Sequence, residues 1–571
     1  KEIGSALAKE ATEGTVQNAY VRSFFHNNEY YLFVFNTYQD VRLVGAPPSS
    51  VGKYGGDTDN WMWPRHTGDF SLFRIYADAE GNPSEISEDN VPLMPKHHLP
   101  VSLNGVKEGD FSMVFGFPGS TDRFLTSTGI DQAVSLYNPS VVEIRAQKLA
   151  IMKEAMDADD AVRIALASNY ASTANYWKYF IGQTEQLKKN RVKAKKEAIE
   201  ARYLEWANAD ASRSEYANAL ELLNEAYAST DATVKNGVYL MEAGIRGASM
   251  PLYAFRLARM LGALSSSEDL DGDKAAVIAY AESHFAEYQA EVDRNLAQAL
   301  WSMWMKNTPA DQQPSIFAEV RDSMGGDVSV LVNDVYDNSI YASQEALEAW
   351  LVEMDKDVLA ADAGGKVSSS FLEAYFGAQS GNAEVSEKMN KGYRLFTDGL
   401  RKAMPEKTFA PDANSTLRMS WGVVGAYDPQ DAVHYDYITT IEGVMQKEDP
   451  TNDEFVVPAK LKELYTAKDY GQYADENGDL VVNFISNNDI TGGNSGSPVI
   501  NGDGHLIGTA FDGNWEAMSG DIFFEDQLQR TISVDIRYTL FIIDKYAGAS
   551  HLIDEMTVVK GKVKKKRKNR K

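Results

Sequence analysis

The sequence predicts an α+β protein of several domains, in which two β-rich regions flank a large all-α region. The chain has 571 residues, too many for one hydrophobic core, so two to four domains are expected. Apolar and polar residues alternate in short runs within residues 1–128 and 413–556, as they do in half-buried strands. Residues 129–412 are rich in Ala, Glu, Lys, Leu and Met, and their apolar residues recur with the helical period.

The composition excludes several classes of protein. A formal net charge of −26 repels nucleic acid, so no nucleic-acid partner is expected. No run of about 18 apolar residues is present, so no membrane span is expected. Cysteine is absent, which excludes a disulfide framework, a thiol nucleophile and a thiolate metal site. The sequence also lacks a phosphate-binding glycine loop and a His-Glu-x-x-His zinc helix, so neither a cofactor nor a metal is expected.

The two ends of the chain differ from the rest. The first residue is Lys and no signal segment follows it, so we expect a processed or truncated product that has lost its targeting information. Residues 557–571 form a basic tail, with nine Lys or Arg and no acidic residue from Lys560 onward. We expect this tail to be a solvated appendage, with a nucleic-acid or surface-binding role as the alternative.

Residues 1–128 are expected to fold as β-strands. Runs rich in aromatic and β-branched residues predict strands at residues 29–35, 40–44, 69–76 and 110–117. The third run alternates apolar and polar residues, and the fourth ends in the Pro118-Gly119 turn.

The central region is expected to be helical throughout. Apolar stripes at the helical period occur in Lys188–Asn208, Glu215–Tyr227, Met250–Leu264, Lys274–Met305 and Ser343–Leu359. No repeat period is found, so a solenoid is not expected. The sequence Asp269–Lys274 resembles the start of a calcium loop, but the sixth position is Lys where such a loop needs Gly. It is interpreted as a loop between helices.

The third region carries a glycine-rich loop with a central serine. Strands are predicted at residues 417–424, 434–440, 480–485, 497–500 and 505–511, and residues 531–544 close the fold with a strand and an apolar helix. Between two of these strands stands Thr491–Val499, which reads Thr-Gly-Gly-Asn-Ser-Gly-Ser-Pro-Val. Its glycines permit positive φ, and the amides of Gly493 and Ser495 are suited to stabilise a developing oxyanion. This pattern is typical of the nucleophile loop in the second barrel of a chymotrypsin-like peptidase. The alternative is a plain glycine turn whose serine caps a neighbouring amide.

A serine nucleophile needs a base and an orienting carboxylate. Asp69 is the candidate acid, because it precedes an alternating strand and should be buried there. His26 has a suitable spacing for the base, but it lacks the small neighbours that pack around a catalytic imidazole. His66 is too close to Asp69 in sequence to be its partner. No histidine of this chain is therefore assigned as the base, and His26 is the fallback.

Three segments together resemble the S46 family of bacterial exo-acting dipeptidyl-peptidases. They are Gly55–Phe70, which contains Asp-Asn-Trp-Met-Trp-Pro-Arg-His-Thr-Gly-Asp, the serine loop Thr491–Val499, and Phe511–Glu516. The resemblance covers nearly the whole chain. It implies a chymotrypsin-like double β-barrel, with the first barrel incomplete, and a large inserted all-α domain. Residues 1–128 would then be the remainder of the first barrel, residues 129–412 a helical lid, and residues 413–556 the second barrel with the nucleophile.

The resemblance also implies roles for individual residues. Ser495 is the nucleophile, Asp69 the triad acid and Gly493 a donor of the oxyanion hole. An exopeptidase must hold the substrate ammonium, which calls for carboxylate and amide oxygens and an aromatic face. The matching positions are Asn60, Trp61, Asn175 and Asp512, with Arg65 and Phe511 nearby.

Two departures from the family pattern shape the expected activity. The triad histidine of the family lies in a Thr-Asn-His-His-Cys segment, whereas the one His-His pair of this chain, His97-His98, follows Asp69. The strands that carry the base are thus expected to be missing, and the chain alone to be inactive. Gly513 stands where the acid-selective branch has Arg, which implies an uncharged specificity pocket, as in the dipeptidyl-peptidase 7 branch.

The expected function is that of a serine exopeptidase that releases dipeptides from oligopeptides through an acyl-enzyme, with an apolar or uncharged P1 residue preferred. By resemblance we expect a homodimer in the bacterial periplasm, at the cell surface or secreted. A non-catalytic peptide-binding protein and an Asp/Glu-selective dipeptidyl-peptidase are the alternatives. An endopeptidase is disfavoured by the helical insertion and by the ammonium site.

Overall fold

The computed structural model describes residues 2–561 and divides the chain into two compact units. The first unit combines Lys1–Leu125 with Met404–Lys571, and the second is Thr126–Ala403. The helical region was predicted at residues 129–412. The second unit therefore starts three residues earlier than predicted and ends nine residues earlier than predicted. Most of the predicted basic tail lies outside the described residues. Among the described helices, none has the length and hydropathy that a membrane crossing requires.

The largest sheet of the first unit contains nine strands. Its main path runs β11–β12–β15–β14–β13–β7–β8, and β6 and β16 pair beside β14. The strand bounds are β6 (Val101–Ser102), β7 (Phe111–Gly116), β8 (Arg418–Val423), β11 (Ile438–Thr440), β12 (Val481–Ser486), β13 (Ser497–Asn501), β14 (Leu506–Gly513), β15 (Thr531–Asp535) and β16 (Val558–Val559).

The path from β12 to β8 closes on itself. A bridge between Val424 and Ser486, and a hydrogen bond from the Gly425 amide to the Ile485 carbonyl at 3.3 Å, join the residues after β8 to β12. The enclosed core contains Val114, Phe484, Val499, Ile507 and Ala510. Closure leaves these six strands without a free edge in this ring.

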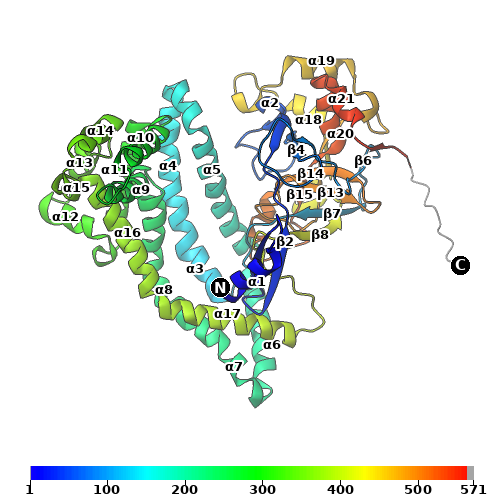
Figure 1. Ribbon diagram of the computed structural model, residues 1–571. Coiled ribbons are helices and arrows are strands. Elements are labelled where there is room, and N and C mark those ends of the chain that lie inside the picture. Colours follow the sequence, from blue (N-terminus) through cyan, green and yellow to red (C-terminus); the bar gives the residue numbers. More distant parts are fainter. Residues whose placement is uncertain (1, 562–571) are drawn as a thin grey trace. The chain divides into compact units, whose positions relative to one another are not determined.

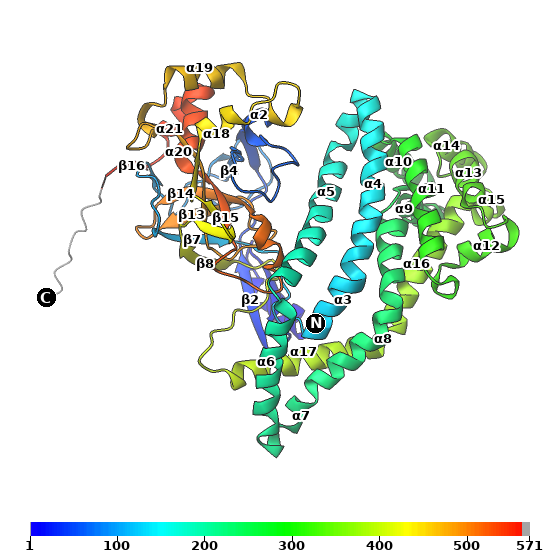
Figure 2. The same ribbon diagram turned by 180° about the vertical axis from the view of Figure 1, so that it is seen from behind.

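Strand β7 precedes the helical unit in sequence, yet it pairs with β13 and β8. In Figures 1 and 2 it is the blue strand among the orange strands β13 and β14. The prediction grouped residues 110–117 with the remainder of a first barrel. The pairing instead makes this strand part of the sheet that carries the serine loop, and the helical unit is inserted between the adjacent strands β7 and β8.

Three smaller sheets complete the strands of the first unit. They are the hairpin β1 (Asn18–Phe24) with β2 (Glu29–Phe35), the three strands β3 (Val41–Gly45), β4 (Leu72–Ala77) and β5 (Val91–Pro92), and the pair β9 (Tyr427–Gln430) with β10 (Val433–Tyr435). Large apolar side chains on β2, β3 and β4 are exposed, including Leu32, Leu43 and Phe73. The three strands β3–β5 form an open sheet.

Helices of the first unit were only partly predicted. Residues Glu2–Thr12 form the helix α1, so the expectation of strands alone in residues 1–128 is wrong there. The predicted apolar helix after Ile532 is confirmed as α20 (Ile536–Phe541), whose Tyr538 and Phe541 are buried in a second core. The others are α2 (Ser49–Gly52), α18 (Ile441–Gln446), α19 (Ala459–Ala467) and α21 (Ser550–Asp554).

The second unit consists of helices and connecting segments, with no strand among its described residues. Its helices are α3 (Ser127–Gln132), α4 (Asn138–Ala158), α5 (Asp160–Lys189), α6 (Val192–Asn208), α7 (Ser214–Ala217), α8 (Ala219–Tyr239), α9 (Met250–Leu264), α10 (Leu270–Phe285), α11 (Ala290–Asn307), α12 (Ser315–Ser323), α13 (Val328–Asn338), α14 (Gln344–Glu353), α15 (Lys356–Ala361), α16 (Ala363–Gly381) and α17 (Ala383–Ala403). The stripe predicted at residues 274–305 corresponds to two helices, α10 and α11, because the helical conformation is interrupted between Phe285 and Ala290.

Packing inside the second unit follows the apolar stripes. Figures 1 and 2 show the long helices α4 and α5 side by side, joined at Asp159, whose side chain caps α5 by accepting from the Ala161 amide at 2.7 Å. The core of the unit is aromatic at its centre, where Trp301, Trp304 and Phe371 are fully buried. Burial of these side chains stabilises the helices, since helix propensity alone is weak.

Candidate active site

Ser495 lies exposed on the loop that connects β12 to β13. Gly493 (φ 104°) and Gly496 (φ 86°) flank it in backbone conformations that glycine adopts without strain. A Cβ atom at Gly493 would lie 2.5 Å from the carbonyl oxygen of Phe117, so no side chain fits there. Gly493 is therefore required both by conformation and by space, and Gly496 is required by conformation alone.

Backbone hydrogen bonds hold the serine loop on both sides. The Gly119 amide donates to the Gly492 carbonyl at 2.7 Å, and the Gly496 amide donates to the Ala510 carbonyl at 2.8 Å. The amides of Gly493 and Ser495 donate no hydrogen bond to any described residue. Two donors in a fixed loop beside the serine hydroxyl are what an oxyanion hole needs, and this role of Gly493 stays a prediction.

The hydroxyl of Ser495 donates to the Phe511 carbonyl on β14 at 3.2 Å. A backbone carbonyl is not a base, so this contact does not activate the oxygen. No histidine among the described residues forms a hydrogen bond with Ser495.

Arg65 and Asp512 form a nearly buried ion pair beside this serine. Nη1 of Arg65 donates to Oδ2 of Asp512 at 2.6 Å, and 8% and 9% of the two side chains are exposed. The same carboxylate accepts from the Trp61 amide at 3.1 Å and from the Gly513 amide at 2.9 Å. The Arg65 guanidinium lies 5.1 Å from the centre of the Phe511 ring. The structure thus joins five residues predicted for the site.

Asp69 lies three residues before the start of β4 and is exposed, which differs from the expected buried acid. Surrounding protein nevertheless raises the pKa of its carboxyl; Arg65 opposes this rise and Asp512 adds to it. Asp69 therefore shares the electrostatic environment of the Arg65–Asp512 pair.

Asn483 fixes the segment that leads to Asp69, and the sequence analysis missed it. Its side chain is buried in β12, accepts from the Thr67 amide and donates to the Thr67 carbonyl, both at 2.9 Å. The backbone amide of Gly68, which follows Thr67, donates to the Val51 carbonyl at 2.9 Å. A polar residue inside the apolar run 480–485 was the available signal.

Replacing Asn483 by leucine should lower the free energy of unfolding of the first unit by about 2–3 kcal/mol. The substitution keeps the volume but leaves the amide and carbonyl of Thr67 unpaired inside the protein. Denaturant unfolding, followed by hydrogen exchange of peptides from β12, measures the change. Asn338→Leu is the control, because the side chain of this exposed asparagine donates to the Asp334 carboxylate one turn earlier in the same helix, α13. Equal effects of both substitutions would contradict the positioning role.

Histidines near the site in sequence have other surroundings. His66 is 6% exposed, and burial lowers its pKa to about 3, with Lys447 and Arg65 adding to the shift. It faces α18 at Gly443, where a Cβ would overlap Nε2 of the ring. His98 pairs with the Thr557 hydroxyl at 2.8 Å, and His26 lies beside Phe124 and Asp412.

The remaining predicted residues are placed as follows. Asn60 is half-buried in the loop before Trp61, and the structure places Asn175 on α5 of the second unit. Gly513 ends β14, and a Cβ on it would lie 3.2 Å from Cβ of Ala517 and 3.5 Å from the Trp61 ring. Their binding roles stay predictions.

Glu454 supports the loop that carries Asn60 and Trp61. Its carboxylate accepts from the Asp57 amide at 2.7 Å and from the Thr58 hydroxyl at 2.6 Å. The sequence offered no sign of this contact, because the partners stand 397 and 396 positions apart.

Comparisons with known proteins agree with the motifs. Residues 1–558 match the model of the family described as Peptidase S46. Dipeptidyl-peptidase 7 of Phocaeicola vulgatus is 44% identical over 548 residues, which are 94% of this chain and 75% of the relative. The Asp/Glu-specific dipeptidyl-peptidase of Porphyromonas gingivalis is 40% identical over 94% of this chain and 75% of the relative. The crystal structure of Porphyromonas endodontalis DPP11 in complex with the dipeptide Arg-Glu superposes with a TM-score of 0.90 at 36% identity, covering 97% of this chain and 80% of that one.

Proposed function

Because the chain belongs to the peptidase S46 family, we propose that it is built as a serine dipeptidyl-peptidase of chymotrypsin-like double-barrel type. The observation that carries the proposal is the loop of Ser495, which holds an exposed hydroxyl between two glycines of positive φ. Two amides that donate to no described residue lie in the same loop. The closed ring of six strands below the loop supports the assignment of a second barrel. The names of the relatives support the dipeptidyl specificity.

The proposed chemistry is acyl transfer. Oγ of Ser495 attacks the carbonyl carbon of the second peptide bond while a general base takes its proton, and the dipeptide becomes an ester of the serine. The amides of Gly493 and Ser495 donate to the oxyanion, an interaction whose loss typically lowers kcat by about 10²–10³. Asp69 orients the base and stabilises its protonated form. Water then hydrolyses the ester, and no metal or cofactor takes part.

The base is proposed to be absent from this chain, which by itself is then inactive. This proposal rests on the contacts of Ser495, whose hydroxyl donates to the Phe511 carbonyl and meets no described histidine. It also rests on the exposure of Asp69, whose carboxylate accepts no hydrogen bond from an imidazole within residues 2–561.

The substrate amine is proposed to bind at Asp512. Three donors use three of the roughly four acceptor positions of this carboxylate, so one position remains for an ammonium group. The Trp61 amide binds this carboxylate, and Asn60 precedes Trp61 in the same loop, so the Trp61 ring and the Asn60 amide oxygen are proposed to contribute to the amine site. A fixed ammonium sets the distance to Ser495 and thereby makes the product a dipeptide.

Release of dipeptides tests this function. The chain, and a form extended to the length of its relatives, receive fluorogenic dipeptide substrates with a free or an acetylated N-terminus. The expected result is cleavage by the extended form alone, with free amines alone, and its loss in Ser495→Ala. Activity of the present chain would overturn the proposal that the base is absent, with His26 as the first residue to replace. An inactive extended form that still binds dipeptides would favour the peptide-binding alternative.

Specificity is proposed to favour an apolar or uncharged P1 residue, because Gly513 places no charge beside Ala517 and Trp61. In the active form, Gly513→Arg should raise kcat/KM for Asp and Glu relative to apolar residues by about tenfold or more, through a charge-assisted hydrogen bond. Gly513→Gln is the matched control, since it fills similar space without charge. An unchanged ratio for Arg, or an equal shift for Gln, would contradict the proposal.

A further inference from the structure

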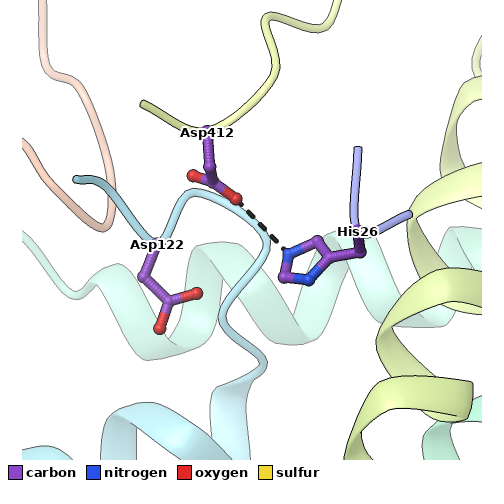
Figure 3. Close-up of side chains that lie close together, drawn as sticks. All are labelled: His26, Asp122 and Asp412. Carbon is purple, nitrogen blue, oxygen red and sulfur yellow. Dashed lines mark ion pairs between the residues drawn. The ribbon is translucent and has the colours of Figure 1, made fainter. Parts of the chain in front are cut away.

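Three side chains that commonly bind metals meet in the first unit. His26 comes from the turn between β1 and β2, Asp122 from the segment after β7, and Asp412 from the segment before β8. One ligand atom of each lies within 4.8 Å of the other two. Figure 3 shows the imidazole of His26 and the two carboxylates gathered around one point. Imidazole nitrogen and carboxylate oxygen are ligands of divalent transition metals.

The turn that carries His26 is held in a definite conformation. Phe25, His26 and Asn27 all have positive φ (51°, 51° and 66°), which ordinary residues adopt rarely. The His26 ring packs edge-on against Phe124 with ring centres 5.7 Å apart. The Asn414 side chain donates to the Ser23 carbonyl at 2.9 Å, which ties β1 to the segment of Asp412. The imidazole therefore has a fixed direction.

Asp412 presents one oxygen to this point. Its Oδ1 accepts from the Thr121 hydroxyl at 2.8 Å and from the Arg123 amide at 2.6 Å. Its Oδ2 is enclosed, accepts no hydrogen bond from a described residue and lies 3.4 Å from Nε2 of His26. Enclosed carboxylate oxygens without a donor are costly. A cation beside Oδ2 would satisfy this oxygen, and Nε2 of His26 lies close enough to serve as a second ligand.

The charge around the cluster favours a cation. Arg123 is the adjacent positive group, but its guanidinium is engaged by both oxygens of Asp489 at 2.8 and 2.7 Å. The carboxylates of Asp521 and Asp412 also act on this guanidinium. Arg418 is a second positive group near Asp412, since its guanidinium donates to the Asp412 carbonyl at 2.9 Å. With Asp122 added, four carboxylates face two arginines, and the excess negative charge attracts a divalent ion.

We propose that His26, Asp122 and Asp412 bind one divalent transition metal ion, preferably Zn²⁺. Zinc bonds of about 2.0–2.2 Å place ligand atoms about 3.3–3.6 Å apart. Nε2 of His26 and Oδ2 of Asp412 are already 3.4 Å apart, so Asp122 alone moves closer on binding, and water takes the fourth position. The ion joins the β1–β2 turn to the segments shortly before Thr126 and shortly after Met404, where the chain leaves and re-enters the first unit. Its role is structural and independent of the peptidase chemistry. The sequence analysis expected no metal, since the three ligands are far apart in the chain.

Calorimetric titration of the chelator-treated chain with ZnCl₂ tests this site. The expected result is one Zn²⁺ per chain, with affinity at least about tenfold lower in His26→Asn and in Asp412→Asn, since even outer-shell partners contribute that much. Asp122→Asn is the second carboxylate variant, because it leaves the hydrogen bonds of Asp412 to Thr121 and Arg123 intact. MgCl₂ should bind more weakly, as Mg²⁺ prefers oxygen ligands and keeps its water.

The control variant is His434→Asn. His434 pairs with Asp428 at 2.7 Å on the surface, so it is a histidine–carboxylate pair without the second carboxylate. The zinc affinity of His434→Asn should stay within about twofold of the wild-type affinity. Zinc should also slow hydrogen exchange in residues 18–35, 117–125 and 409–418 of the wild type but not of Asp122→Asn. Absence of stoichiometric binding, or equal affinity in wild type and all three ligand variants, would leave a simple His26–Asp412 ion pair and overturn the proposal.

Discussion

Replacing Arg65 by methionine should lower the free energy of unfolding of the first unit by about 3–5 kcal/mol. The substitution leaves the nearly buried carboxylate of Asp512 without its counter-ion. It also removes the donors that reach the Asp59 carbonyl at 2.8 Å and the Thr67 hydroxyl at 2.7 Å. Denaturant unfolding, followed by hydrogen exchange of peptides from β12 and β14, measures the loss in this unit, and peptides from α4 and α5 report on the other.

A double-mutant cycle separates the ion pair from the packing of the arginine stem. Asp512→Asn in the Arg65→Met background should recover at least about 1 kcal/mol of the summed single losses, because neither charge is then left alone. Arg294→Met is the matched control, since Arg294 makes a 2.7 Å pair with Asp337 on the surface of the helical unit. Exposed pairs of this kind contribute about 0–1 kcal/mol. Equal losses at Arg65 and Arg294 would show that burial does not set the strength of the site pair.

Replacing His66 by asparagine should flatten the acid side of the stability profile. Burial, aided by Lys447 and Arg65, lowers the pKa of His66 to about 3 in the folded chain, whereas the ordinary value is 6.5. The unfolded state thus binds a proton between these values and the folded state does not. The contribution to stability is fully present above pH 6.5 and is lost as the pH falls toward 3, at about 1.4 kcal/mol per pH unit.

The measurement is the free energy of unfolding at several pH values between 3 and 7, in wild type and variant. The slope of the unfolding free energy against pH should differ between wild type and variant by close to one bound proton. This comparison does not depend on how stable His66→Asn is at any single pH. Replacement of the exposed His434 in the same way is the control for loss of a surface imidazole. Identical slopes for wild type and His66→Asn would contradict a neutral, buried His66.

Both predictions concern residues whose importance the sequence indicated only through the long motif Gly55–Phe70. The motif led to Arg65 and to membership in the family, which the comparisons confirm. It did not reveal that Arg65 binds Asp512, which stands 447 positions away. Nor did it show that His66 turns toward Gly443 and away from solvent. Contacts of this kind depend on which strands become neighbours, and no local pattern encodes that.

By itself, the sequence determined the features that depend on local chemistry. Apolar periodicity located several helices of the second unit and most strands, and the glycines around Ser495 specified a loop of positive φ, because these properties require only neighbouring residues. The tertiary structure alone decided that β7 joins the sheet of the serine loop, that Asn483 holds the segment of Asp69, and that His26, Asp122 and Asp412 meet. These outcomes follow from strand register and ring closure, which bring together residues that are hundreds of positions apart in the chain.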